Sequence, residues 1–318
     1  MGGEFLARLC PCCGESAGAG EMSSAQRAEA LSFDALRPSW AGLDRERVFF
    51  TYRRCADCGL LYNPAYFTDE MLAALYADLA PNMDMVPADM LAQTQRAYWD
   101  RIREMAEQGG DYLEIGPDVG YIAAEAARSG NFGHFWLYEP NRAVHRTLRK
   151  AAGRRHVTIS ADMMDLSAVP DASIGLAVMI HVLDHLLDPL GMVRQIMRKL
   201  RPGGMLVTVT HDEASMLRRL LGLKWPPFCL QHPQLFNPHT VSRLLGRAGF
   251  EPAETRATSN LFPADFLTRQ AAQALGLKMG FGWVPPVPVR LRLGNMMAFA
   301  RSPRQAASAS PERARQRA

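Results

Sequence analysis

From Asp89 onward, short apolar runs alternate with longer segments in which apolar residues recur at helical spacing. This alternation constrains the fold more than any other feature, because strands that alternate with helices form a parallel sheet covered by helices on both faces. The predicted helices cover residues 89–108, 122–128, 192–200 and 241–248. The predicted strands cover residues 112–115, 135–138, 156–159, 174–180, 205–210, a segment near residue 251, and 295–300. The sequence therefore predicts an α/β body with a seven-stranded sheet over residues 111–302.

The first predicted strand runs directly into a glycine-containing turn, Gly116-Pro117-Asp118-Val119-Gly120, and a helix follows. Glycine lets the backbone approach a bound ligand, and the free amides of a helix N-terminus attract an anionic group. Glu139 stands at the tip of the next strand, where a carboxylate accepts hydrogen bonds from both hydroxyls of a ribose. Nicotinamide-binding proteins use the same arrangement, so the turn alone predicts a nucleotide cofactor without naming it.

Five motifs together resemble the class I S-adenosylmethionine-dependent methyltransferases. They are Leu113-Glu114-Ile115-Gly116, Glu139, Ala161-Asp162-Met163, the run from His181 to Pro189, and Leu200-Arg201-Pro202-Gly203-Gly204, which we expect to turn before the fifth strand. The resemblance implies a Rossmann-like fold and S-adenosylmethionine as cofactor. It implies that Glu114, Gly116 and Gly120 contact the methionine part, that Glu139 holds the ribose, and that Asp162 contacts the adenine amine.

Asp118 departs from the family pattern, since it stands where the middle glycine of G-x-G-x-G is expected. Its side chain could crowd the ligand or repel the carboxylate of the methionine part. Sugar C-methyltransferases with a cysteine-rich front module look similar in carrying Asn or Asp inside this turn. We therefore expect Asp118 to be part of a working cofactor site. The alternative is a relic of the fold that no longer binds the cofactor.

The front of the chain carries two CxxC pairs, each followed by glycine: Cys10 with Cys13, and Cys55 with Cys58. Two residues between thiolates let a tight turn aim both sulfurs at one ion, and four such ligands suit tetrahedral zinc. Short strands are expected over residues 48–52 and 60–62, so residues 1–65 predict a zinc-ribbon-like module with a structural zinc ion. Cys12 could replace Cys13 as a ligand, and free thiols are the alternative to a metal site.

Histidines at the predicted carboxyl edge of the sheet are the catalytic candidates, because ligands bind at that edge and imidazole titrates near neutral pH. We expect His181, His211 and His232 to line the acceptor pocket, although each could serve packing or capping instead. His232 belongs to a loop rich in Pro and aromatic residues (224–228 and beyond) that could cover the substrate. His181, Asp184 and His185 would share one helix face, which could also ligate a metal. Cys229 is expected to be a packing residue.

Charge and composition restrict the partners and the compartment. A net charge of +4 is mild, and the front module lacks the dense basic surface of nucleic-acid-binding proteins. Its main positive charges are Arg45, Arg47, Arg53 and Arg54. The few, clustered cysteines indicate a reducing compartment. No apolar run reaches the length of about 18 residues that spans a membrane, and the first residues lack the apolar core of a signal peptide. We expect a cytoplasmic protein with a small-molecule substrate.

The ends of the domains follow from composition. Residues 66–110 are expected to be linking helices. Residues 303–318, which are rich in arginine, alanine and serine, are expected to be a disordered basic tail, because such a segment buries too little apolar surface to fold. Residues 260–288 look like an insertion before the last strand.

The leading hypothesis for the function is methylation of a small molecule, a sugar or secondary metabolite. The alternatives are an RNA methyltransferase, or a non-catalytic binding protein that keeps the methyltransferase fold.

Overall fold

A seven-stranded sheet forms the centre of the computed structural model, which describes residues 4–40, 48–77, 86–107, 109–275 and 284–304. The strand order is β12-β15-β10-β9-β6-β7-β8, and β15 alone runs antiparallel to its neighbours. The strands are β6 (Asp111–Ile115), β7 (His134–Tyr138), β8 (His156–Ser160), β9 (Ile174–Ile180), β10 (Leu200–His211), β12 (Glu254–Ala257) and β15 (Asn295–Arg301). The α/β prediction and each of the seven predicted strands are confirmed.

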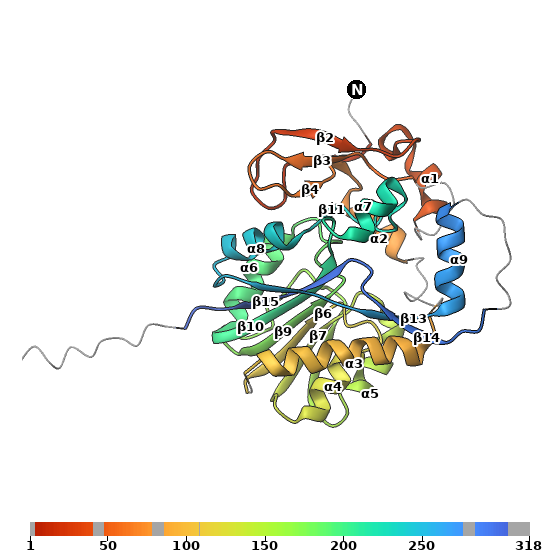
Figure 1. Cartoon of the computed structure of the whole chain (residues 1–318). Coiled ribbons are helices and arrows are strands. Elements are labelled where there is room, and N and C mark those ends of the chain that lie inside the picture. The colour runs from red at the N-terminus through yellow and green to blue at the C-terminus, as the bar shows by residue number, and fades with distance from the viewer. Residues whose placement is uncertain (1–3, 41–47, 78–85, 108, 276–283, 305–318) are drawn as a thin grey trace, which may run out of the picture.

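Helices cover both faces of this sheet, as the alternation predicts (Figure 1). On one face lie α3 (Ala88–Met105), α4 (Tyr121–Ser129) and α5 (His145–Ala151), and on the other α6 (Pro189–Lys199) and α8 (Pro238–Arg247). The strand residues alternate between the two apolar layers: Tyr112 packs with α3 and α4, whereas Leu113 packs with α6 and α8. α3, expected as a linker, is therefore part of the core.

The N-terminal module builds its sheet partly from the body. Its four strands are β2 (Gly18–Met22), β3 (Tyr52–Cys55), β4 (Leu61–Tyr62) and β11 (Gln234–Leu235), in the order β11-β4-β3-β2, and β11 belongs to the body by sequence. β1 (Leu6–Ala7) pairs with β5 (Ala65–Tyr66), and the short helices α1 (Phe33–Leu36) and α2 (Asp69–Ala77) complete this part. The strand expected from residue 48 begins only at Tyr52.

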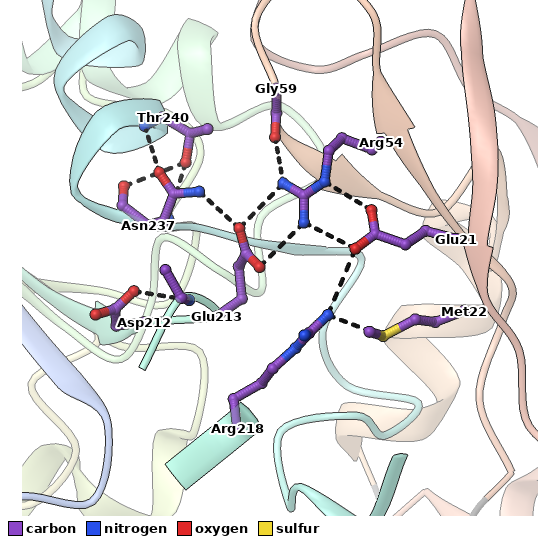
Figure 2. A network of polar contacts seen from close by, with 10 residues as sticks. Glu21, Met22, Arg54, Gly59, Asp212, Glu213, Arg218, Asn237 and Thr240 are labelled. Carbon is purple, nitrogen blue, oxygen red and sulfur yellow. Dashed lines mark hydrogen bonds and ion pairs between the residues drawn. The ribbon is translucent and has the colours of Figure 1, made fainter. Parts of the chain in front are cut away.

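An ionic network joins the module to the body a second time (Figure 2). Both terminal nitrogens of Arg54, on β3, donate to the carboxylate of Glu213 at 3.1 Å, and Glu213 is only 4% exposed. Glu213 Oε1 also accepts a 2.6 Å hydrogen bond from Nδ2 of Asn237, the residue that caps α8. Glu21, on β2, pairs with Arg54 and with Arg218 of α7 (Met216–Leu221). Module and body thus share buried polar contacts as well as a sheet.

Several expected boundaries move for local reasons. α6 begins at Pro189, earlier than expected, because the Asp188 side chain caps it by accepting from Gly191 N at 2.8 Å. The turn expected at residues 202–204 is instead a bulged part of β10, with a positive φ at Gly203. No helix in the described part of the chain is long and apolar enough to cross a membrane.

The last segments of the chain also differ from expectation. The insertion holds β13 (Asn260–Pro263), α9 (Ala264–Leu275) and β14 (Pro288–Leu291). Arg301 still belongs to β15, and Arg304, expected in a disordered tail, forms an ion pair with Glu107. The remaining tail, residues 305–318, and the arginines at 45 and 47 lie outside the described residues.

Candidate functional site

Two glycines in the turn after β6 occupy positions where a side chain would be strained. Gly116 and Gly120 have positive φ values of 67° and 84°. A Cβ on Gly116 would lie 2.5 Å from Val182 Cγ2, and one on Gly120 would lie 2.8 Å from Leu148 Cδ2. Gly116 therefore lets the turn pack closely against the segment that follows β9, and Gly120 lets it pack against α5.

Asp118 adopts the left-handed backbone conformation, with a φ of 49°. Aspartate and asparagine enter this region more readily than other non-glycine residues, because their short side chains bond locally. The Asp118 amide donates a 2.9 Å hydrogen bond to Glu139 Oε2. The position that departs from the glycine pattern thus keeps a glycine-like backbone and connects the first turn to the acid after β7.

We expect Asp118→Gly to bind S-adenosylhomocysteine within a few-fold of the parent protein. The amide that bonds Glu139 remains, and glycine adopts a positive φ without strain. Calorimetric titration of both proteins measures the affinity. A parent that fails to bind, together with a glycine variant that binds, would mean that the Asp118 side chain blocks the site.

Glu139 is nearly buried, at 8% exposure, and both of its carboxylate oxygens accept backbone hydrogen bonds. Oε2 accepts from Asp118 N, and Oε1 accepts from Asn141 N at 2.8 Å. Burial raises the pKa of Glu139, while these two hydrogen bonds oppose the rise. Each oxygen keeps a second lone pair, so the carboxylate can still accept from two hydroxyls.

The other expected cofactor residues lie at the same edge in different surroundings. Glu114 is buried, Tyr112 Oη donates to its Oε2 at 2.8 Å, and burial raises the pKa of Glu114 to about 8. Asp162, just past β8, is exposed, and its Oδ1 accepts from Met164 N at 3.0 Å. Glu114 therefore carries a proton at neutral pH, whereas Asp162 is open to solvent.

Four histidines gather beyond the carboxyl ends of β9 and β10. The ring of His211 lies 5.0 Å from that of His181 and 4.8 Å from that of His232, and His185 lies 4.6 Å from His232, between ring centroids. His211 Nδ1 is 2.6 Å from Asp184 Oδ2, and the Asp184 side chain is fully buried. The structure thus brings together all three histidines that the sequence nominates, and adds Asp184 and His185.

The protonation of this cluster follows from burial and from mutual contacts. Burial, aided by the neighbouring histidines, lowers the pKa of His181 and of His185 to about 3, and burial also lowers the pKa of His211. Burial alone would raise the pKa of Asp184, but His211 and the other histidines hold that pKa well below its usual value. At neutral pH the Asp184 carboxylate is ionised, and the imidazoles of His181, His185 and His211 are neutral.

His232 has a different partner, which the sequence did not reveal. Its Nδ1 lies 3.3 Å from Cys229 Sγ and 2.7 Å from Pro227 O. Burial lowers the pKa of His232, but the charge and hydrogen-bond interactions with Cys229 raise that pKa to about 9, and His232 in turn lowers the pKa of Cys229. Cys229 was expected only to pack; its position three residues before His232 is the signal that could have suggested this pair.

The helix face expected from His181, Asp184 and His185 does not exist. Residues 181–188 form turns, and α6 begins only at Pro189. His181 has a positive φ of 54°, which directs the chain away from a helix. As a result His211, from the next strand, joins His181 and Asp184, while His185 turns toward His232.

The cysteines at the front converge as the paired motifs predict. Ligand atoms of Cys10, Cys13, Cys55 and Cys58 all lie within 4.8 Å of one another, and two of the Sγ–Sγ distances are 3.4 Å. Zinc–sulfur bonds of about 2.3 Å place tetrahedral sulfurs about 3.8 Å apart, so the cluster fits one zinc ion with small adjustments. Cys12 is buried but stands outside this group of four.

Comparison with known proteins matches the chain to methyltransferases. Residues 90–255 match a family model described as a methyltransferase domain. An uncharacterized methyltransferase from Mycobacterium sp. (strain JLS) is 28% identical over 136 residues, which are 42% of this chain and 49% of that protein. The match thus spans about half the length of that relative.

Solved structures with a similar body are distant in sequence. A possible histamine N-methyltransferase from Thermotoga maritima is 15% identical with a TM-score of 0.45, covering 67% of this chain and 89% of that one. A methyltransferase from Mesorhizobium loti is 18% identical with a TM-score of 0.45, covering 64% and 97% of the respective chains.

Proposed function

This chain belongs to the S-adenosylmethionine-dependent methyltransferases, and from that premise we propose that the whole protein methylates a small molecule, such as a sugar or a secondary metabolite. The observation that carries the proposal is the meeting of two sites at one sheet edge. The glycine turn with Glu139 lies against Val182, and the next residue back, His181, opens the histidine cluster. A cofactor bound at the turn would place its methyl group near that cluster.

We assign the cofactor contacts as follows. Gly116, Asp118 and Gly120 form the backbone turn beside the methionine part, and Glu114, which accepts a hydrogen bond from Tyr112 Oη, stands at the end of the strand that leads into it. Glu139 accepts from the ribose hydroxyls. Asp162, exposed after β8, accepts from the adenine amine.

The acceptor side is assigned to His181, His211 and His232. Methyl transfer needs a nucleophile in line with the methyl group, and often the loss of a proton from that nucleophile. His181 and His211 supply neutral imidazoles, and Asp184 a buried carboxylate, at the place where the acceptor would lie. These groups would accept a hydrogen bond from an acceptor hydroxyl, and His232, whose pKa is raised to about 9, would donate one, so that the acceptor oxygen is held toward the methyl group.

The N-terminal module supports the small-molecule assignment through its position. Tyr52 Oη donates to His232 O at 2.6 Å, and Trp225 and Phe228 of the expected cover loop pack with Phe49 and Tyr52. The module, with structural zinc at its four cysteines, then forms one wall of the acceptor pocket. A cysteine-rich front module is also a feature of the sugar C-methyltransferases that the sequence resembles. The free cysteines are suited to a reducing compartment, so we place the protein in the cytoplasm.

Glu139→Ala tests the proposal through cofactor binding alone, so that no acceptor is needed. Hydrogen bonds to a charged acceptor contribute roughly 1.5–3 kcal/mol, and we expect the affinity for S-adenosylhomocysteine to fall at least about tenfold. Calorimetry measures this change, and Glu104→Ala, an exposed acid on α3, is the control that should bind like the parent. An unchanged affinity in Glu139→Ala would remove Glu139 from the site. A parent with no affinity for the cofactor product would favour the non-catalytic alternative.

A further inference from the structure

Three side chains from two segments, the turn after β9 and the end of β10, converge within the histidine cluster. One ligand atom each of His181, Asp184 and His211 lies within 4.8 Å of the other two. Divalent ions bind imidazole nitrogen and carboxylate oxygen at about 2.0–2.2 Å, which puts neighbouring ligand atoms about 3–4 Å apart. Small side-chain rotations would therefore close these three donors around one ion.

Two of these residues carry polar atoms that lack a partner. In the described part of the chain, His181 Nδ1 and Asp184 Oδ1 are buried and accept or donate no hydrogen bond. Asp184 is 0% exposed, so water does not reach its carboxylate from outside. A buried polar group left unpaired costs about 1–3 kcal/mol, and native proteins rarely keep one without an ion or an ordered water. Both unpaired atoms belong to the same converging set, which points to a missing ligand between them.

We propose that His181, Asp184 and His211 bind one divalent transition-metal ion, separate from the cysteine site. Two imidazole nitrogens and one carboxylate oxygen suit Zn²⁺, Fe²⁺, Co²⁺ or Mn²⁺, whereas Mg²⁺ prefers oxygen ligands throughout. Three protein ligands leave at least one coordination position open. This donor set differs from the one expected on a shared helix face, because His211 replaces His185.

The location of the ion gives it a role that rests on the proposed function. Val182, next to His181, packs against Gly116 of the cofactor turn, and His211 ends the strand beside β9. An acceptor hydroxyl bound at the open position would lose its proton to water more readily. Its oxygen would then bond to the methyl carbon while the carbon–sulfur bond breaks and its electron pair stays on sulfur, leaving S-adenosylhomocysteine.

Cobalt binding to the full chain tests the site without any acceptor. The protein is first saturated with zinc, freed of loosely held metal with a weak chelator, and dialysed against Co²⁺. We expect one Co²⁺ per chain beyond the retained zinc, with visible absorption of nitrogen and oxygen ligands and no thiolate charge-transfer band. His181→Gln and His211→Gln should weaken this binding at least about tenfold, while His185→Gln, from the same cluster, should change it less than about twofold. Excess Mg²⁺ should not compete.

Each outcome of the cobalt experiment supports or overturns the proposed metal site. A parent protein that takes up no second metal overturns the proposal and leaves Asp184 and His211 as a metal-free hydrogen-bonded pair. Equal losses in His185→Gln and His211→Gln would show that other residues form the site. Titration of the same proteins with S-adenosylhomocysteine separates this question from the proposed function, because cofactor binding should be retained in all of the variants.

Discussion

Replacing Cys55 with serine is expected to reduce the zinc content from about one ion per chain to nearly none and to unfold the N-terminal module. Cys55 is 2% exposed and meets Cys13 at 3.4 Å between sulfurs. Structural zinc contributes about 10–16 kcal/mol of binding energy that is also folding energy. The module is small, and its sheet has only short strands, so it cannot replace that energy by burying apolar surface. The seven-stranded body should remain folded.

Metal analysis of the purified protein measures the zinc, and limited proteolysis maps which part loosens. Cys12→Ser and Cys229→Ser are the matched controls: Cys12 lies beside the four ligands and Cys229 is remote in sequence, and both variants should keep the ion. Loss of zinc from Cys12→Ser would put Cys12 in place of Cys13. A parent prepared without chelator that holds no zinc would contradict the zinc assignment altogether.

Replacing Arg8 with methionine should destabilise the whole protein by about 2–4 kcal/mol, because several buried acceptors lose a charged donor. Arg8 donates to Pro233 O at 3.1 Å, to Leu187 O at 3.0 Å and to Gln234 Oε1 at 3.0 Å. Burial lowers the pKa of Arg8 to about 10, so it remains charged at neutral pH. Methionine keeps much of the apolar stem and removes the hydrogen bonds.

In a chain of this size, this loss should lower the melting temperature by roughly 3–6 °C. Arg243→Met is the control, because Arg243 also crosses between body and module, to Asp57, but at an exposed site where an ion pair contributes at most about 1 kcal/mol. Equal melting temperatures for Arg8→Met and the parent would mean that the module and the body are energetically independent.

Arg8→Met also tests how the N-terminal module contacts the segment that carries the histidine cluster. Gln234 accepts a hydrogen bond from Arg8, and its own Nε2 donates to Leu183 O at 3.1 Å and to Leu186 O at 2.7 Å. Leu183 and Leu186 flank Asp184 and His185. Arg8 therefore contacts the segment that carries the histidine cluster in two ways, directly at Leu187 O and through Gln234.

The sequence was sufficient where the signal is local and periodic. Apolar runs predicted the central strands of the body, such as β9 and β10, because a strand buried between helices must be apolar along its length. The mostly exposed edge strand β12 was expected only from its place after the helix that ends before Gly249. The spacing of Cys10, Cys13, Cys55 and Cys58 predicted the group of four that converges, because two residues between cysteines suffice to aim both sulfurs inward. The glycine turn was also predictable, because two glycines directly follow an apolar strand, and the structure shows why they suit it: both have a positive φ and pack closely against side chains.

Only the tertiary structure decided which histidines share a site. Helical spacing paired His181 and Asp184 with His185, but a left-handed His181 breaks the helix, and the parallel register of β9 with β10 brings in His211 instead. Likewise, nothing in the sequence around Gln234 predicted that this residue would belong to a strand of the module's sheet. These outcomes depend on contacts between residues far apart in the chain, and no local pattern encodes the distance between two strand ends. The sequence by itself determined the elements and the cysteine group, whereas packing determined which residues form the histidine cluster.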